Sequence, residues 1–280
     1  MRRWLIAVLT LLLLTAAACG EGDTEVGDDN GSDTGGQEEV EFTTIEEGVL
    51  KVGSCLDYAP FEFFEEGAEE PTGFDVEIVD AIASELDLEV EWTKANFETI
   101  FTALQGGQFD MVAAASTITP EREEIVAFSD PYFNARQGLS VQSGGEITGQ
   151  GDLGEGHTVG VQKGTTGEAW AKENLVPNGV ELKSFEFAPD AFADLEAGNV
   201  DAVVNDEGSS IAEVEARSGL EVIETIDTDE NYGLALPQDN PELKEAVDQA
   251  LATVIEDGTY EEIFLKYFPD LPVPDEFAAA

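Results

Sequence analysis

The chain is short of basic residues. It has 12 Lys and Arg against 61 Asp and Glu in 280 residues, which gives a formal net charge of −49. A protein that binds nucleic acid or an anionic lipid surface through a basic patch needs clustered Lys and Arg to neutralise phosphates. The charge balance therefore excludes both kinds of interaction.

Histidine and cysteine are scarcer still. His157 is the single histidine, and Cys19 and Cys55 are the two cysteines. The histidine is far in sequence from either cysteine, so the sequence predicts no metal site, no cofactor and no His-based catalytic triad. If Cys19 is modified as described next, Cys55 has no disulfide partner and is expected to be a small buried hydrophobic residue.

No apolar run is long enough to span a bilayer. Two arginines precede an apolar stretch from Trp4 to Leu14, and small residues then lead to Cys19. This arrangement predicts a signal peptide over residues 1–18. A Cys directly after small residues resembles a bacterial lipobox, so we expect a lipid on Cys19 to anchor the chain to the outer face of the cell membrane. A plain secretory signal is the alternative.

The segment after Cys19 lacks the means to form a core. Residues 20–41 contain nine acidic side chains, six glycines and no Lys or Arg. Such a composition is typical of a disordered, self-repelling linker. We therefore predict an acidic tether over residues 19–43 and a folded part from about Thr44 to Pro269.

Strand-like and helical patterns alternate through the folded part. Apolar residues at 74, 76, 79, 82 and 86 have helical spacing, and short apolar runs separate such stretches. Expected strands are 49–52, 88–92, 109–114, 157–161, 180–185, 200–204 and 220–226. Expected helices are 74–86, 97–104, 165–174, 190–197, 211–216, 241–256 and 260–267. The alternation predicts an α/β protein with parallel-type sheets and a ligand at the carboxyl ends of the strands.

Two segments look like copies of one unit. Residues 104–115 and 195–206 share Leu, Gly, Asp and Val at matching places, 91 positions apart. Two similar lobes could therefore present strand ends to each other across a cleft. The first segment leads on to Arg122 and the second ends at Asp206. A cation facing an anion suits a zwitterion such as a free amino acid.

Arg122 stands in an unusual place for a cation. Thr119 is a favourable N-cap and Pro120 a favourable first residue of a helix, so Arg122 falls in the first turn. A positive charge there opposes the helix dipole, whereas a guanidinium is suited to hold a carboxylate by two hydrogen bonds. A surface ion pair with Glu121 or Glu124 is the alternative, and these residues alone leave both open.

The run from Thr117 to Arg122, followed by Phe128–Tyr132, resembles the core signature of the family 3 solute-binding proteins. These are the extracytoplasmic receptors of polar amino acid ABC importers. Further segments similar to the family, in the family's order, are Tyr58–Phe63, Gly73–Val76, Gly164–Thr166 and Asp257–Tyr260. The resemblance covers essentially all of residues 46–269.

The resemblance implies a two-lobed α/β fold of the periplasmic-binding-protein type II, with a ligand cleft between the lobes. The first lobe would comprise residues 46–136 plus 231–277, and the second residues 137–230. Two crossovers, near 134–137 and 228–232, would be hinges. The protein would act as a monomer.

The resemblance also implies roles for individual residues. Arg122 would bind the α-carboxylate of the ligand, aided by Thr117 and the backbone N–H of Thr166, at a helix N-terminus that favours an anion. Asp206 would pair with the α-ammonium, with the Ala115 carbonyl and the Thr117 hydroxyl as further acceptors. The alternative for Asp206 is a simple helix cap.

The side chain of the ligand would meet other residues. Tyr58 and Phe97 would sandwich it, and core packing is their alternative role. Family members that bind cationic or amide side chains often carry Asp where this chain has Cys55. Gln162 and Ser116 would supply neutral polar contacts instead, so we expect a neutral polar ligand, such as glutamine.

The resemblance thus implies a binding protein rather than an enzyme, with an ABC permease and ATPase complex as partner. One alternative is a sensor that presents an amino acid to a signalling receptor. Another is an enzyme like the cyclohexadienyl dehydratases, which needs a general acid in the cleft. Glu62, Glu168 and Glu207 are the candidates for that acid.

Overall fold

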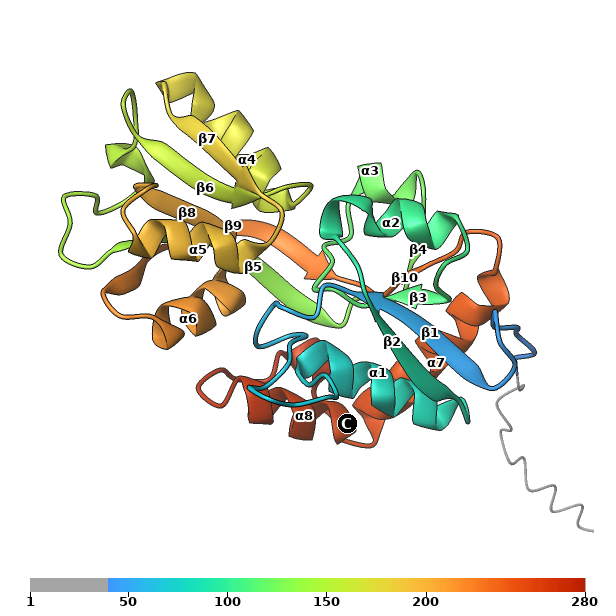
Figure 1. Ribbon diagram of the computed structural model, residues 1–280. Coiled ribbons are helices and arrows are strands. Elements are labelled where there is room, and N and C mark those ends of the chain that lie inside the picture. Colours follow the sequence, from blue (N-terminus) through green and yellow to red (C-terminus); the bar gives the residue numbers. More distant parts are fainter. Residues whose placement is uncertain (1–39, 280) are drawn as a thin grey trace, which may run out of the picture. The chain divides into compact units, whose positions relative to one another are not determined.

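The computed structural model describes residues 40–279. The predicted signal peptide, Cys19 and residues 19–39 of the predicted tether lie outside the described residues. The remainder contains two five-stranded sheets, each flanked by helices (Figure 1). We call them the first and second lobes.

The first lobe has the strand order β2-β1-β3-β10-β4. β1 pairs in parallel with β2 and β3, and β10 is antiparallel to both of its neighbours. The strands are β1 (Val49–Ser54), β2 (Glu89–Lys94), β3 (Met111–Val112), β4 (Ala127–Phe128) and β10 (Ala235–Leu236). The helices are α1 (Phe74–Glu85), α2 (Phe97–Gln105), α3 (Pro120–Glu123), α7 (Pro241–Glu256) and α8 (Thr259–Tyr267).

The second lobe has the strand order β7-β6-β8-β5-β9. Its strands are β5 (Phe133–Gln142), β6 (Thr158–Gln162), β7 (Glu181–Phe185), β8 (Ala202–Asp206) and β9 (Leu220–Tyr232). Its helices are α4 (Thr166–Asn174), α5 (Ala188–Glu196) and α6 (Glu207–Ala216). Short 3₁₀ turns occupy Gln150–Asp152, Val176–Asn178 and Asp275–Phe277.

β5 and β9 form a two-stranded ribbon that leads from one sheet to the other (Figure 1). They are antiparallel, with Phe133 opposite Tyr232 and Gln142 opposite Leu220. The expectation of parallel-type sheets is therefore wrong for these two strands, because the chain crosses between the lobes in opposite directions, and it is also wrong for the antiparallel β10. The predicted hinges at 134–137 and 228–232 fall inside the ribbon, and the lobe boundaries predicted there stay a proposal.

The internal repeat is a structural one. α2 and β3 begin at residues 97 and 111, and α5 and β8 begin 91 positions later, at 188 and 202. The strands differ in length, since β3 has only two residues where the pattern predicts six. Directly before β3, the carboxylate of Asp110 accepts from the backbone N–H groups of Ile45 and Lys51.

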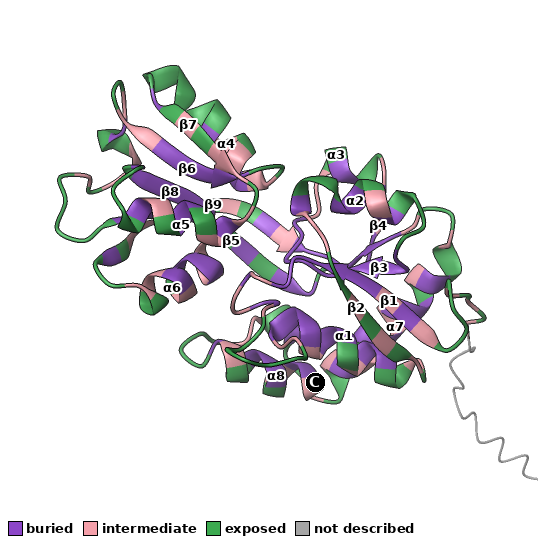
Figure 2. Ribbon diagram, viewed as in Figure 1, coloured by how far each residue is buried: buried purple, intermediate pink, exposed green. Residues whose placement is uncertain are grey.

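Burial follows the layers (Figure 2). The inner strands β6 and β8 are almost wholly buried, whereas the edge strand β2 is mostly exposed. The core of the first lobe includes Phe61 and Phe74, both inaccessible to solvent and packed edge to face. Burial of large aromatic side chains of this kind contributes on the order of 2–3 kcal/mol each. Each lobe therefore has its own apolar support beneath the residues that face the other lobe.

Candidate functional site

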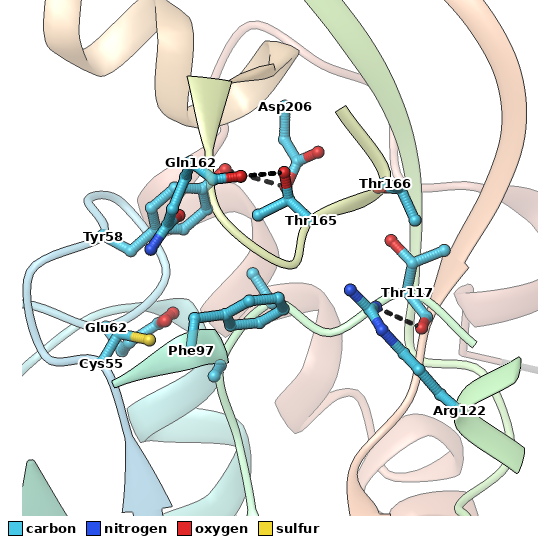
Figure 3. A pocket seen from close by; sticks show the side chains of 12 residues that line it. Cys55, Tyr58, Glu62, Phe97, Thr117, Arg122, Gln162, Thr165, Thr166 and Asp206 are labelled. Carbon is cyan, nitrogen blue, oxygen red and sulfur yellow. Dashed lines mark hydrogen bonds between the residues drawn. The ribbon is translucent and has the colours of Figure 1, made fainter. Parts of the chain in front are cut away.

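One pocket collects most of the predicted binding residues (Figure 3). Residues from both lobes contribute to it. Its lining consists of Cys55, Tyr58, Glu62, Phe97, Ala114, Ala115, Thr117, Arg122, Gln162, Thr165, Thr166 and Asp206.

Arg122 lies at this pocket because α3 begins as the sequence predicts. Thr119 is the N-cap and its hydroxyl accepts from the Arg122 N–H at 3.2 Å, with Pro120 as first helical residue. The guanidinium is buried and donates to the carbonyl of Thr117 at 2.6 Å and to that of Gly164 at 3.2 Å. Its Cζ lies 5.1 Å from the ring centre of Phe97.

No carboxylate within residues 40–279 forms an ion pair with Arg122, so the surface pair with Glu121 or Glu124 is absent there. Burial lowers the pKa of the guanidinium, while the more distant Asp206 and Glu230 oppose that shift. A buried cation without a paired anion is costly unless a ligand supplies one. The pocket therefore has a ready place for an anion.

Asp206 is the last residue of β8 and precedes α6. Its side chain caps no helix N–H. Instead its carboxylate accepts from Tyr232 Oη at 2.7 Å, Tyr58 Oη at 2.8 Å and Gln137 Nε2 at 2.5 Å. Burial and the neighbouring Glu230 raise its pKa to about 6, against the effect of these hydrogen bonds.

Glu230, on β9, connects the two lobes beside the pocket. Its Oε2 accepts from the hydroxyls of Thr117 at 2.6 Å and Thr166 at 2.7 Å. Its Oε1 accepts from Gln137 Nε2 at 3.0 Å and Thr228 Oγ1 at 2.7 Å. This network fixes both threonine side chains. The Thr117 hydroxyl, predicted as an acceptor for the ligand, already donates to Glu230.

Thr166 is the first residue of α4, whose N-cap is Thr165. The predicted capping box is present in part: Thr165 Oγ1 accepts from the Glu168 N–H at 3.1 Å, and the Glu168 carboxylate accepts from the Gly164 N–H. The start of α4 thus lies at the pocket with its free N–H groups near the lining, which suits an anion.

Ala115 has a positive φ of 43°, rare for a residue with a side chain. Its N–H donates to Asp75 Oδ2 at 2.8 Å, and Asp75 is completely buried in α1. The carboxylate of Asp75 therefore holds the strained turn after β3 in place, and with it the backbone at the pocket.

Tyr58 and Phe97 both line the pocket and are both largely buried (Figure 3). Besides Asp206, the Tyr58 hydroxyl contacts Asn205 Oδ1 at 3.0 Å. Phe97 is the first residue of α2, and the Asn96 side chain caps that helix. Phe97 is therefore positioned by a first-lobe helix, whereas the hydroxyl of Tyr58, also a first-lobe residue, is held by two residues of β8 in the second lobe.

Two of the three residues predicted to affect specificity line the pocket, and the third does not. Cys55 and Gln162 line the pocket, and burial raises the pKa of the Cys55 thiol well above its ordinary value. Ser116 does not line it. Its side chain is inaccessible to solvent, and its hydroxyl donates to the Ala114 carbonyl at 3.3 Å.

Of the three candidate general acids, only Glu62 lines the pocket. Glu207 forms an ion pair with Arg136 at 2.8 Å. Burial raises the pKa of Glu168, but hydrogen bonds from the Gly164 N–H and Ser184 and the pairing with Lys172 outweigh it, so the pKa is lowered. These two carboxylates have structural partners of their own.

Sequence reasoning named Glu62 only as a candidate general acid of the cleft, and it did not identify Thr165 in the lining or Glu230 and Gln137, which hydrogen-bond to lining residues. A signal for Glu62 was present, because a lone acid between Phe61 and Phe63 is unusual in an apolar run. Glu230 had no such signal, since it follows other acids on a strand and only pairing across the ribbon turns it inward.

The described residues contain no group of three or more His, Cys, Asp or Glu placed to hold a metal ion. His157 has a local role, since its Nδ1 accepts from the Gly154 N–H at 3.1 Å. From residue 40 to 279, no helix has both the length and the apolar character needed to cross a bilayer.

Curated proteins similar to this chain are amino-acid-binding proteins. A probable histidine-binding protein of Neisseria gonorrhoeae is 29% identical over 272 residues, which cover 96% of each chain. An ABC transporter glutamine-binding protein of Bacillus subtilis is also 29% identical, over 274 residues and 96% of each chain.

Solved structures agree. An ancestral arginine-binding protein bound to arginine is 39% identical with a TM-score of 0.75, covering 79% of this chain and 98% of that one. An ancestral arginine-binding protein bound to glutamine is 40% identical with a TM-score of 0.76, covering 80% of this chain and 100% of that one. An ancestral amino-acid-binding protein, a precursor of cyclohexadienyl dehydratase, is 36% identical with a TM-score of 0.72, covering 79% and 95%.

These likenesses confirm the predicted α/β fold, two-lobed and of type II. The family model for bacterial extracellular solute-binding proteins, family 3, matches residues 50–270. The match spans more than half of the chain and includes every residue that lines the pocket. The chain therefore belongs to the family 3 bacterial extracellular solute-binding proteins.

Proposed function

We propose that the protein captures a free L-amino acid outside the cytoplasm and delivers it to an ABC importer. One observation carries the proposal: a buried Arg122 and an Asp206 line the same pocket, and neither has an ion-pair partner in the described part of the chain. An α-carboxylate and an α-ammonium on one small molecule satisfy both.

In this proposal the α-carboxylate binds the guanidinium of Arg122 and the N–H groups at the start of α4, including that of Thr166. Thr117 lies beside them but is occupied by Glu230. The α-ammonium binds Asp206, with the Ala115 carbonyl as a second acceptor. Each hydrogen bond to a charged group contributes about 1.5–3 kcal/mol.

Tyr58 and Phe97 flank the ligand side chain, and Cys55 and Gln162 lie near its end. The expectation of a neutral polar ligand rested on the missing carboxylate at position 55. Glu62 supplies a carboxylate to the same pocket, so that argument no longer favours a neutral ligand.

Hinge closure follows from the position of the two charges. Arg122 belongs to the first lobe and Asp206 to the second, and the chain passes between them through β5 and β9. A ligand that bonds to both lobes binds the closed arrangement better than an open one, which is the differential affinity that closure requires.

Delivery to a permease and ATPase complex rests on the family and on the relative named as an ABC transporter protein. A monomer attached to the membrane only by a lipid on Cys19 fits that role. Presentation of an amino acid to a signalling receptor is the second reading, and it uses the same pocket.

For an enzyme of the cyclohexadienyl dehydratase type, Glu62 is the one candidate general acid that lines the pocket. Burial, together with Asp75, Asp57 and Asp206, raises its pKa well above the ordinary value. The substrates of such an enzyme, prephenate and arogenate, belong in the same test. Turnover of either one would replace the binding-protein assignment.

The test is a thermal-shift panel on the purified protein with all common L-amino acids, prephenate and arogenate. A ligand at about 100 times its Kd adds about 2.7 kcal/mol, a shift of about 5–10 °C for a domain of this size. Arg122→Lys and Asp206→Asn should each make the shift clearly smaller at the same ligand concentration. Asp201→Asn, which removes a charge from the exposed residue just before β8, should keep it. No shift with any amino acid would refute the proposal.

A further inference from the structure

Glu62 is a buried carboxylate whose side chain has no hydrogen-bond partner in the described part of the chain. It is inaccessible to solvent, yet neither of its carboxylate oxygens has a hydrogen-bond partner among residues 40–279. Its backbone is well fixed, since its N–H and C=O both pair with Tyr58 at 3.1 and 2.8 Å. A buried polar group without a partner is rare and costly in a folded protein.

The surroundings of Glu62 contain acids and neutral groups. Asp75, Asp57 and Asp206 are the charged groups that act on it, and all three raise its pKa. Cys55, Tyr58 and Tyr132 are the other titratable groups that sense it, and each is uncharged at its raised pKa. Lys94, which acts on the neighbouring Cys55, is already paired with Asp57 at 2.7 Å. A positive charge brought beside Glu62 would therefore meet no competing cation.

Glu62 lies away from the groups that would hold the α-carboxylate. Figure 3 shows Cys55 and Glu62 together at one side of the pocket, beyond Phe97, with Arg122 and Thr117 at the other side. Arg122 and Asp206 account for both charges of the amino acid backbone. Glu62 is then a surplus negative group at the end of the pocket that the ligand side chain reaches.

We propose that Glu62 makes this pocket selective for an amino acid whose side chain carries a positive charge, a guanidinium or an ammonium. The inference rests on the proposed function. The carboxylate comes from position 62 in place of position 55, which in this chain is the uncharged Cys55. Binding the cation ionises Glu62 and gives its orphaned oxygens their partners.

The test compares ligands of equal shape and different charge. L-Citrulline has the length of L-arginine but a neutral urea group, so the ratio of their Kd values measures the contribution of the charge. Calorimetry on the wild-type protein should show L-arginine or L-lysine bound at least tenfold more tightly than L-citrulline and L-glutamine. A charge-assisted hydrogen bond of usual strength corresponds to about 10- to 100-fold.

Two variants make the test specific. Glu62→Gln should bring the citrulline-to-arginine ratio close to one while L-citrulline still binds, which also shows that the variant folds. Glu65→Gln removes one negative charge from an exposed residue three positions further along the same loop and lies outside the pocket lining, so it should keep the wild-type ratio. Were Glu62→Gln not to fold, the wild-type ratio alone would still decide.

Three results would overturn the inference: a wild-type preference for L-glutamine or L-citrulline, a ratio unchanged in Glu62→Gln, or an equal loss of the ratio in Glu65→Gln. In each of these, binding that still depends on Arg122 and Asp206 would leave the proposed function standing. Absence of binding by every amino acid would refute the proposed function itself.

Discussion

Asp206→Asn should weaken ligand binding and at the same time stabilise the unliganded protein. The carboxylate is held by Tyr58, Tyr232 and Gln137, none of which is a cation. Its pKa is raised from 3.8 to about 6 by burial first and by Glu230 second. The folded state therefore binds this proton more tightly than the unfolded state.

The sign of the stability effect follows from that difference. Between about pH 4 and 6 the folded state holds more protons than the unfolded one, so stability falls as pH rises through this window and stays lower above it. At 1.36 kcal/mol per pKa unit, keeping Asp206 ionised at pH 7 costs at most about 3 kcal/mol.

Asparagine removes this cost but loses one acceptor oxygen, and one donor without its partner costs about 1–2 kcal/mol. We expect a net stabilisation of about 1–2 kcal/mol. The melting temperature without ligand should then rise by about 2–8 °C.

The effect on binding has the opposite sign. An α-ammonium left in the pocket without its carboxylate costs about 2–5 kcal/mol, or about 30-fold to several thousandfold in Kd. Scanning calorimetry at pH 7 and titration with the amino acid that gives the largest thermal shift measure the two effects. Asp201→Asn is the matched control, since it removes the same charge from the exposed start of the same segment.

Two results would refute the reasoning about Asp206. One is a variant that binds within about threefold of the wild type. The other is a variant that melts at a lower temperature than the wild type without ligand. In that case the ionised Asp206 would stabilise the unliganded fold, whereas the reasoning requires that it destabilise the fold and serve binding.

Three further predictions concern the same pocket. Arg122→Lys replaces a planar fork by a single ammonium, so affinity should fall about 10- to 100-fold while the melting temperature changes little; wild-type affinity in this variant would exclude Arg122 as the carboxylate site. Affinity for L-citrulline, whose side chain is neutral, should fall about tenfold per pH unit below the Asp206 pKa of about 6 and level off above it, and Asp206→Asn should abolish this dependence in titrations from pH 4.5 to 8. Glu230→Gln places an amide between the hydroxyls of Thr117 and Thr166, and urea unfolding should show a loss of about 1–3 kcal/mol; an unchanged midpoint would mean that this network contributes nothing.

The sequence predicted most local structure because local signals are self-contained. The helix over 241–256 was expected with the bounds that α7 has, and the caps at Thr119 and Thr165 were identified from residues within four positions. The 91-residue repeat marked the equivalent helix and strand of each lobe before any contact was known. These features depend on spacing along the chain, which the sequence displays directly.

Tertiary structure decided which side chains enter the pocket. Ser116 and Thr117 are neighbours, yet only Thr117 lines it, because successive residues of an extended chain point to opposite sides. β5 went unpredicted, and it is held as a strand by antiparallel pairing with β8 and β9, which lie far along the chain. Glu230 became part of the site through the same ribbon. Pairing between distant segments turns particular side chains inward, and no local pattern in the sequence records it.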